Sequence, residues 1–163
     1  MNWEALGAIG EIVGAVAVVV TLGYLAVQIR QNTRALKAST HQSLSDSTIR
    51  FQAVTLDNPE VARIRLAGAE DRSKLTGEEL YRFITAMEML FRLIENGFVQ
   101  HQGGTLDDEG WHRYAETVPY LFGKYPGIVD WWDSPRIPFS PSFSAWVDEQ
   151  LAAARERAGA NRP

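Results

Sequence analysis

Eighteen consecutive residues near the N-terminus carry no charge. They run from Ile12 to Ile29 and read IVGAVAVVVTLGYLAVQI. An α-helix of this length spans about 27 Å, close to the roughly 30 Å hydrocarbon thickness of a bilayer. Apolar residues begin already at Ala5, and Glu11 is the single charged residue between there and Ile29. We therefore expect residues 5–29 to form one transmembrane helix.

Two other interpretations of this segment have less support. A buried core helix of a soluble domain is one, although an uncharged run of this length is typical of a membrane span. A cleaved signal peptide is the other, but such peptides begin with a basic region and end at a small-residue cleavage site. This chain begins Met1-Asn2-Trp3-Glu4, and no cleavage site follows the apolar run.

Positive charge follows the apolar segment and predicts its orientation. Arg30, Arg34 and Lys37 come after the segment, whereas Glu4 is the only charged residue that precedes residue 5. Cytoplasmic flanks of membrane helices carry an excess of Lys and Arg. The N-terminus is therefore expected outside and the C-terminal part in the cytoplasm, with Trp3 placed as an interfacial anchor.

The expected span has two unlike faces. At 100° per residue, small and polar side chains gather within about a third of the helix circumference. These residues are Gly7, Gly10, Glu11, Gly14, Thr21 and Gln28. Gly10 and Gly14 form a small-xxx-small pair, which lets a second helix approach closely. The face is predicted to contact a second copy or another membrane protein; the alternative is that glycine is simply frequent in membrane helices.

Glu11 has two interpretations of its own. Counting back about 20 residues from Ile29 places the outer boundary of the bilayer near Gly10, so the carboxylate would lie at the interface with water. In the alternative, Glu11 lies deeper, where a carboxylate is costly and is paired or faces a pore in an oligomer.

The remaining sequence predicts helices. No glycine or proline interrupts residues 30–58, which are expected to form a helical stalk. Residues 59–158 are expected to form a helical cytoplasmic domain, and residues 159–163 a frayed tail. The signal Asn58-Pro59 predicts a short helix to about Ala69. No segment shows the alternation of a strand, so the fold class is all-α.

Within this domain, Thr76 and Glu79 form a capping box that begins the most apolar helix, residues 77–102. Thr105 with Asp108 is predicted to cap a helix that runs to about Gly123 with a possible kink at Pro119. Residues 125–138 are expected to be irregular, because three prolines and a glycine interrupt them. A last helix is expected from Ser140-Pro141 to about Arg157.

Charged residues on the 77–102 helix are spaced for ion pairing. Arg92 lies four residues after Glu88 and three before Glu95, so all three share a face. We expect a partly buried structural ladder. A metal or acid–base site that also includes His112 is the alternative.

Nine aromatic residues fall between positions 114 and 146. The structural interpretation is that they pin irregular segments onto helices. The functional alternatives are a pocket for an apolar or cationic ligand or a patch that dips into the bilayer surface. Residues at the centre of these alternatives are Tyr120, Tyr125, Trp131 and Trp132.

Composition adds few chemical possibilities. The 163-residue chain is 45% hydrophobic, carries a net charge of −4 and has no cysteine. A globular chain without an overall basic field gives no indication of a nucleic-acid partner. No phosphate loop, serine elbow or histidine-glutamate zinc motif occurs, so no cofactor, metal or catalytic residue is predicted. His112 and Glu116 share a helix face, but solvated side chains account for them.

The opening of the chain resembles a known group of proteins. The segments Leu6-Gly7-Ala8-Ile9-Gly10-Glu11 and Gln28-Ile29-Arg30-Gln31-Asn32 are similar to those of small bacterial inner-membrane proteins of uncharacterised function. A looser similarity rests on Gly97, Trp111 and residues 143–147. The resemblance implies a bacterial inner-membrane protein with one N-terminal span and a helical cytoplasmic part, and it implies no activity.

Together these features predict a single-pass protein anchored in the lipid bilayer. The leading functional hypothesis is an interaction or scaffold protein, or an accessory subunit of a membrane complex, that self-associates through its span. The alternative is a small homo-oligomeric channel in which Glu11, Thr21 and Gln28 face the pore. An enzyme is the third hypothesis, which no catalytic constellation supports.

Overall fold

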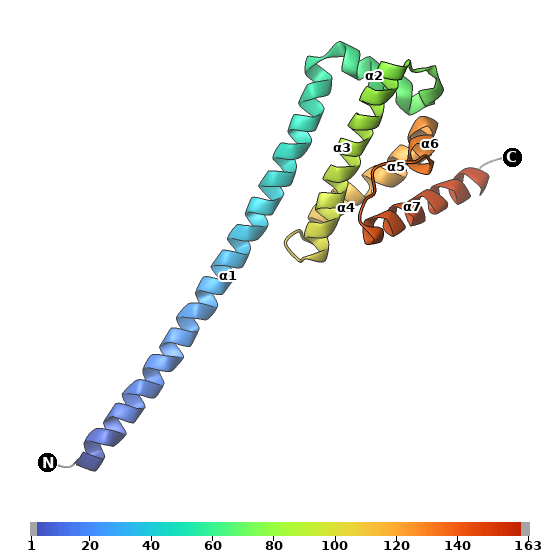
Figure 1. Cartoon of the computed structure of the whole chain (residues 1–163). Coiled ribbons are helices and arrows are strands. Elements are labelled where there is room, and N and C mark those ends of the chain that lie inside the picture. The colour runs from blue at the N-terminus through green and yellow to red at the C-terminus, as the bar shows by residue number, and fades with distance from the viewer. Residues whose placement is uncertain (1–2, 161–163) are drawn as a thin grey trace. The chain divides into compact units, whose positions relative to one another are not determined.

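Helices make up the regular structure of residues 3–160, the part of the chain that the computed structural model describes (Figure 1). Their bounds are α1 Trp3–Asp57, α2 Pro59–Asp71, the 3-10 turn η1 Arg72–Lys74, α3 Gly77–Gln102, α4 Asp108–Ala115, α5 Thr117–Lys124, α6 Pro126–Asp133 and α7 Pro141–Ala160. No strand occurs in this range. The expected all-α class is therefore confirmed.

The chain divides into two compact units, and the division falls within α1, between Ser39 and Thr40. The described part of the first unit is helix throughout, with every side chain of residues 9–36 exposed. Within the described residues, α1 is the one helix long and apolar enough to cross a membrane.

The second unit holds the end of α1 and helices α2 to α7. Helix α3 packs against α2 and α4, while α7 packs against α5 and α6 against α2. Phe91 of α3 is fully buried and contacts the rings of Phe122, Trp131 and Trp132. Leu44 of α1 is 1% exposed, so part of the expected stalk is buried in this unit.

Two helix caps form where the sequence predicts them. The Asn58 side chain accepts hydrogen bonds from the backbone N–H groups of Glu60 and Val61. Thr76 and Glu79 form the reciprocal capping box, which satisfies two N–H groups that would otherwise be unpaired. Gly104, after the end of α3, has φ +72°, a conformation that favours glycine.

The single helix expected from residue 105 to 123 is wrong. Asp107, not Thr105, caps α4 by accepting from the backbone N–H of Gly110 at 2.9 Å, and the Thr105 hydroxyl donates to the Gln100 carbonyl instead. The helix ends at Ala115 and α5 begins at Thr117. Pro119 explains the break, because it lacks an N–H group and its ring clashes with the carbonyl four residues earlier.

The irregular segment expected at residues 125–138 is also wrong. Residues 126–133 form α6, since Pro126 occupies the first helical turn, where proline is tolerated. Ile128, Trp131 and Trp132 then bury one face of this helix. At the C-terminus, α7 extends to Ala160, so residues 159–160 of the expected frayed tail are helical and residues 161–163 lie outside the described range.

Helices α2 and α6 approach each other closely through two glycines. A Cβ atom built on Gly127 would lie 2.9 Å from the Ala69 carbonyl oxygen and closer still to that of Gly68. These contacts involve backbone, which cannot rotate away as a side chain can. The close approach brings α6 onto the α2–α3 pair and helps to form one side of the cavity described below.

Candidate functional site

The residues predicted to form a membrane interface are exposed on the first unit. Gly7, Gly10 and Gly14 lie on the surface of α1, and a Cβ atom on any of them would meet nothing within 4 Å. Glu11 and Gln28 are exposed as well. Side-chain atoms or lipid tails therefore have open access to this face of the helix.

Thr21 differs from the other polar residues of this face. Its hydroxyl donates a hydrogen bond to the Ala17 carbonyl oxygen at 2.8 Å, so its donor is satisfied within the helix. In the part of the chain that the structure describes, neither the Glu11 side chain nor the Gln28 side chain forms a hydrogen bond or an ion pair with another residue. Of the three polar residues predicted to face a pore, Thr21 therefore needs no water molecule or second helix to accept a hydrogen bond from its hydroxyl.

Two members of the predicted aromatic pocket or patch are buried in the core. Trp131 and Trp132 are each 1% exposed, so they cannot form a surface patch, and this part of the expectation is wrong. They pack around Phe91, and the Trp132 indole N–H donates to the Asp148 carboxylate at 2.7 Å. Ile128, Trp131 and Trp132 stand at i, i+3 and i+4, which is the apolar spacing of a helix. The prediction of an irregular segment gave more weight to the prolines than to this spacing.

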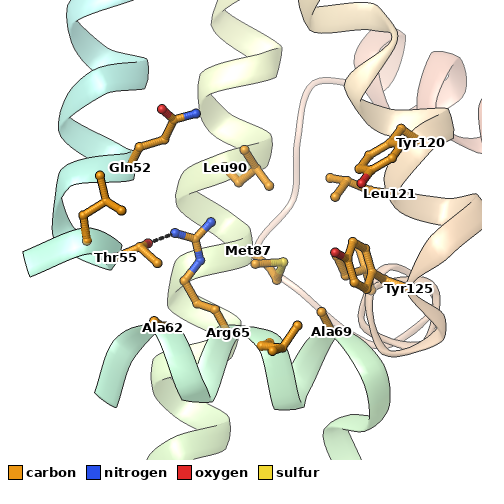
Figure 2. Close-up of a pocket in the computed structure, with 13 residues that line it drawn as sticks. Gln52, Thr55, Ala62, Arg65, Ala69, Met87, Leu90, Tyr120, Leu121 and Tyr125 are labelled. Atoms are coloured by element: carbon orange, nitrogen blue, oxygen red, sulfur yellow. Dashed lines mark hydrogen bonds between the residues drawn. The ribbon is translucent and has the colours of Figure 1, made fainter. Parts of the chain in front are cut away.

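The other two members line a cavity of about 450 Å³ in the second unit (Figure 2). The walls come from the last turns of α1, one face of α2, two residues of α3, Leu121 of α5 and Ile128 of α6. The two residues of α3 are Met87 and Leu90. Figure 2 shows Arg65 on the side of α1, and Tyr120 and Tyr125 on the opposite side. Most of the lining is aliphatic, and Arg65 is its only charged residue.

Arg65 is half-buried and has no acidic partner among the described residues. Its guanidinium hydrogen-bonds the Thr55 hydroxyl and lies 4.2 Å from the centroid of the Phe51 ring. Burial lowers the pKa of the guanidinium, because the charged form loses hydration. Arg65 also lines a neighbouring cavity of about 410 Å³, and neither lining contains Asp or Glu.

A second cation, Lys124, lies beside the two tyrosines but does not line the cavity. Lys124 is exposed, its ammonium donates to the Tyr120 hydroxyl at 3.1 Å, and it lies 5.1 Å from the Tyr125 ring centroid. Hydrogen bonds to Tyr120 and Tyr125 raise the pKa of Lys124. Lys124 therefore keeps its hydration, whereas the half-buried Arg65 loses part of its own.

One of the two ion pairs of the predicted Glu88–Arg92–Glu95 ladder on α3 is present. Arg92 pairs with Glu95 at 2.8 Å, but within the described residues no ion pair joins Arg92 to Glu88, so that half is wrong. The Glu95 carboxylate instead accepts from the Ser140 N–H at 2.7 Å, and Arg92 donates to the Pro138 carbonyl. Burial raises the pKa of Glu95, but the bonds from Ser140 and Arg92 outweigh it and lower the pKa overall. The pair thus attaches the segment before α7 to α3.

The three histidines lie beside separate acidic side chains. His101 contacts Asp108 at 2.9 Å, His41 contacts Asp107 at 3.4 Å, and His112 lies 3.9 Å from Glu116. Glu88 and Glu95 are not part of these contacts. Among the described residues, no group of three or more potential metal ligands gathers.

The cavity and Arg65 were missed by sequence reasoning, although a signal exists. Ala62, Leu66 and Ala69 recur at helical spacing on α2, and Arg65 interrupts this otherwise apolar face. A charged residue within a core-facing stripe indicates a buried or cavity-lining charge. Comparisons with known proteins add nothing here, because no family model, curated protein or solved structure matches the chain.

Proposed function

We propose that the chain is a single-pass membrane protein whose span anchors the helical unit of residues 40–163 and associates with a second copy. The observation that carries this proposal is the uncharged stretch of α1, none of which is buried. A core helix of a soluble protein would bury such a stretch, since exposing its many Val, Ile and Leu side chains to water is strongly unfavourable. A bilayer removes this cost.

The glycine face supports association within the membrane. Lipid is as apolar as the side chains themselves, so helices associate there through close packing rather than through the hydrophobic effect. The open space over Gly10 and Gly14 permits that packing. A scaffold, or an accessory subunit that binds another membrane protein through this face, fits the same surface.

Disulfide trapping tests self-association directly, because the chain has no cysteine. Single cysteines at Gly10 and Gly14 should give covalent dimers in native membranes, and cysteines at Val16 and Val20 on the opposite face should not. Equal trapping on both faces would contradict the proposal. Trapping of a different membrane protein at positions 10 and 14 would favour the accessory-subunit form.

A matched pair of glycines supplies the control. Gly14→Ile should reduce association at least about tenfold, because a branched side chain separates the packed backbones. Gly23→Ile makes the same change on the other side of the helix, where a Cβ atom also meets nothing within 4 Å, and should leave association unchanged.

We also propose that the N-terminus lies outside and residues 40–163 lie in the cytoplasm of a bacterium. The basic residues after the span support this orientation. In intact cells, a membrane-impermeant maleimide should label Trp3→Cys and leave Lys37→Cys unlabelled until the membrane is opened. The reverse labelling pattern would overturn the orientation without affecting the association result.

A further inference from the structure

The charge of Arg65 has no counter-ion within the described residues. A guanidinium that is partly removed from water is stabilised by pairing with a carboxylate, yet among the described residues the Arg65 guanidinium interacts with a neutral hydroxyl and an aromatic ring. Both interactions leave donor N–H groups of the fork available. An anion placed in the cavity would complete the set of partners.

The rest of the cavity selects what kind of anion fits. Its volume of about 450 Å³ lies within the usual range of ligand pockets, about 300–1,000 Å³. Met87, Leu90 and Leu121 form its apolar floor. Leu56 and Leu66 also line it while remaining 83% and 54% exposed, so apolar surface is left open to a ligand. A small hydrated anion would use none of this surface.

We propose that this cavity binds an amphipathic carboxylate of the fatty-acid type. The carboxylate pairs with the guanidinium of Arg65, whose planar fork matches two carboxylate oxygens, and the hydrocarbon tail lies along the leucine and methionine side chains toward Tyr120 and Tyr125. The positive charge of Arg65 disfavours the cationic ligand considered from the aromatic residues alone. This site is independent of the membrane span and of self-association.

The anionic end is assigned to Arg65 rather than to Lys124. Lys124 is exposed to water and already donates to the Tyr120 hydroxyl, so a carboxylate gains little by replacing its hydration. Arg65 is half-buried, where a charge-assisted hydrogen bond is stronger. Arg65 lines the cavity and Lys124 does not, so the two cations can be tested separately.

The test uses the full chain in lipid nanodiscs and a photoreactive diazirine analogue of dodecanoic acid. After irradiation, adducts should map to peptides of α2 and α3 that line the cavity, and labelling should saturate. The methyl ester of the same probe keeps the tail and lacks the charge. The ester should need at least about a tenfold higher concentration for half-maximal labelling, the factor expected for losing a charged hydrogen bond.

Variants identify the residue that holds the carboxylate. Arg65→Met should raise the half-maximal concentration of the acid at least about tenfold and leave the ester unchanged, while Arg65→Lys should retain part of the preference for the acid. Lys124→Met is the matched control and should change neither. Ala62→Phe, which fills the cavity without removing charge, should reduce labelling by both probes.

Several results would overturn the proposal. Equal labelling by acid and ester in the unaltered chain would show that charge is not recognised, a result that needs no folded variant. Loss of labelling in Lys124→Met but not in Arg65→Met would place the carboxylate at the other end. Competition by acetate at the same concentration as the fatty acid would show a simple anion site, for which the apolar lining is irrelevant.

Discussion

Apolar side chains are exposed in the first unit of the chain and buried in the core of the second. In the first unit, Val16 is 58% exposed and Val20 is 65% exposed, whereas in the second unit Phe91 and Phe143 are completely buried. Apolar side chains are removed from water only where another apolar surface meets them. Helix α3 meets that surface within the second unit, whereas no such surface covers residues 9–36 within the first unit.

Polar groups differ in the same sense. In the first unit, the hydroxyls of Thr21 and Thr33 bond to carbonyls of their own helix. The second unit has such bonds too, at Ser47 and Thr48. It also has ion pairs between helices, as Arg63 of α2 forms with Glu79 of α3 and Arg155 of α7 with Asp133 of α6. Hydroxyls that bond within their own helix suit lipid, where no water replaces a missing bond. Bonds between helices instead fix one packing arrangement.

The largest effect that tests this contrast is a core truncation. Phe91→Ala should destabilise the second unit by about 3–5 kcal/mol, because a fully buried ring leaves a cavity among Phe122, Trp131 and Trp132. Chemical denaturation followed by tryptophan emission measures the change. Val16→Ala is the counterpart in the first unit and should leave this transition unchanged. A shift of equal size would show that the apolar segment packs on the domain.

A glycine in each unit gives the next effect. Gly127→Ala should cost about 1–3 kcal/mol, at the upper end because the added methyl meets the carbonyls of Gly68 and Ala69. Gly14→Ala should cost the monomer nothing, since its added methyl enters open space. The same denaturation measurement compares them. If Gly127→Ala is neutral, helices α2 and α6 do not pack as closely as the structure has them.

Local signals in the sequence predicted much of this fold. Asn58, the Thr76–Glu79 box and the apolar spacing of α3 each determine a helix boundary through contacts within a few residues. The prediction for residues 105–138 was less accurate, because Pro126 was taken to interrupt a helix, although Pro59 and Pro141 were taken to begin one. Pro126 stands at the start of a helix, whereas Pro119 ends one; the position within the helix decides which effect proline has.

The candidate sites were less predictable for a different reason. The glycine face of α1 follows from helical periodicity alone, because the spacing of residues along the sequence is enough to predict which of them share a helix face. The Arg65 cavity requires α1, α2, α3, α5 and α6 to meet, and the spacing of residues along one helix does not show which helices meet. Glu95 shows the same limit, since its partner at Ser140 lies 45 residues away, while the expected neighbour Glu88 does not join the pair.

The smallest expected effect is that of lowering the pH, to which the two units should respond differently. The N–H group of Thr76 and the guanidinium of Arg63 lower the pKa of Glu79 to about 2. Because this folded-state pKa lies below the unfolded value, the contribution to stability is present above about pH 4.5 and is lost as the pH falls toward 2. Glu79→Gln retains an acceptor for the Thr76 N–H but lacks the charge. The variant should therefore show a shallower decline of unfolding free energy over that range, and Glu78→Gln, an exposed neighbour, should decline as the unaltered chain does.

The apolar stretch of α1 from Ile12 to Ile29 has no ion pair among its described residues, so its helical signal in lipid should persist at pH 2 while the tryptophan emission of the second unit shifts. Loss of both signals at the same pH would show that acid acts on the two units together and would remove the contrast between them.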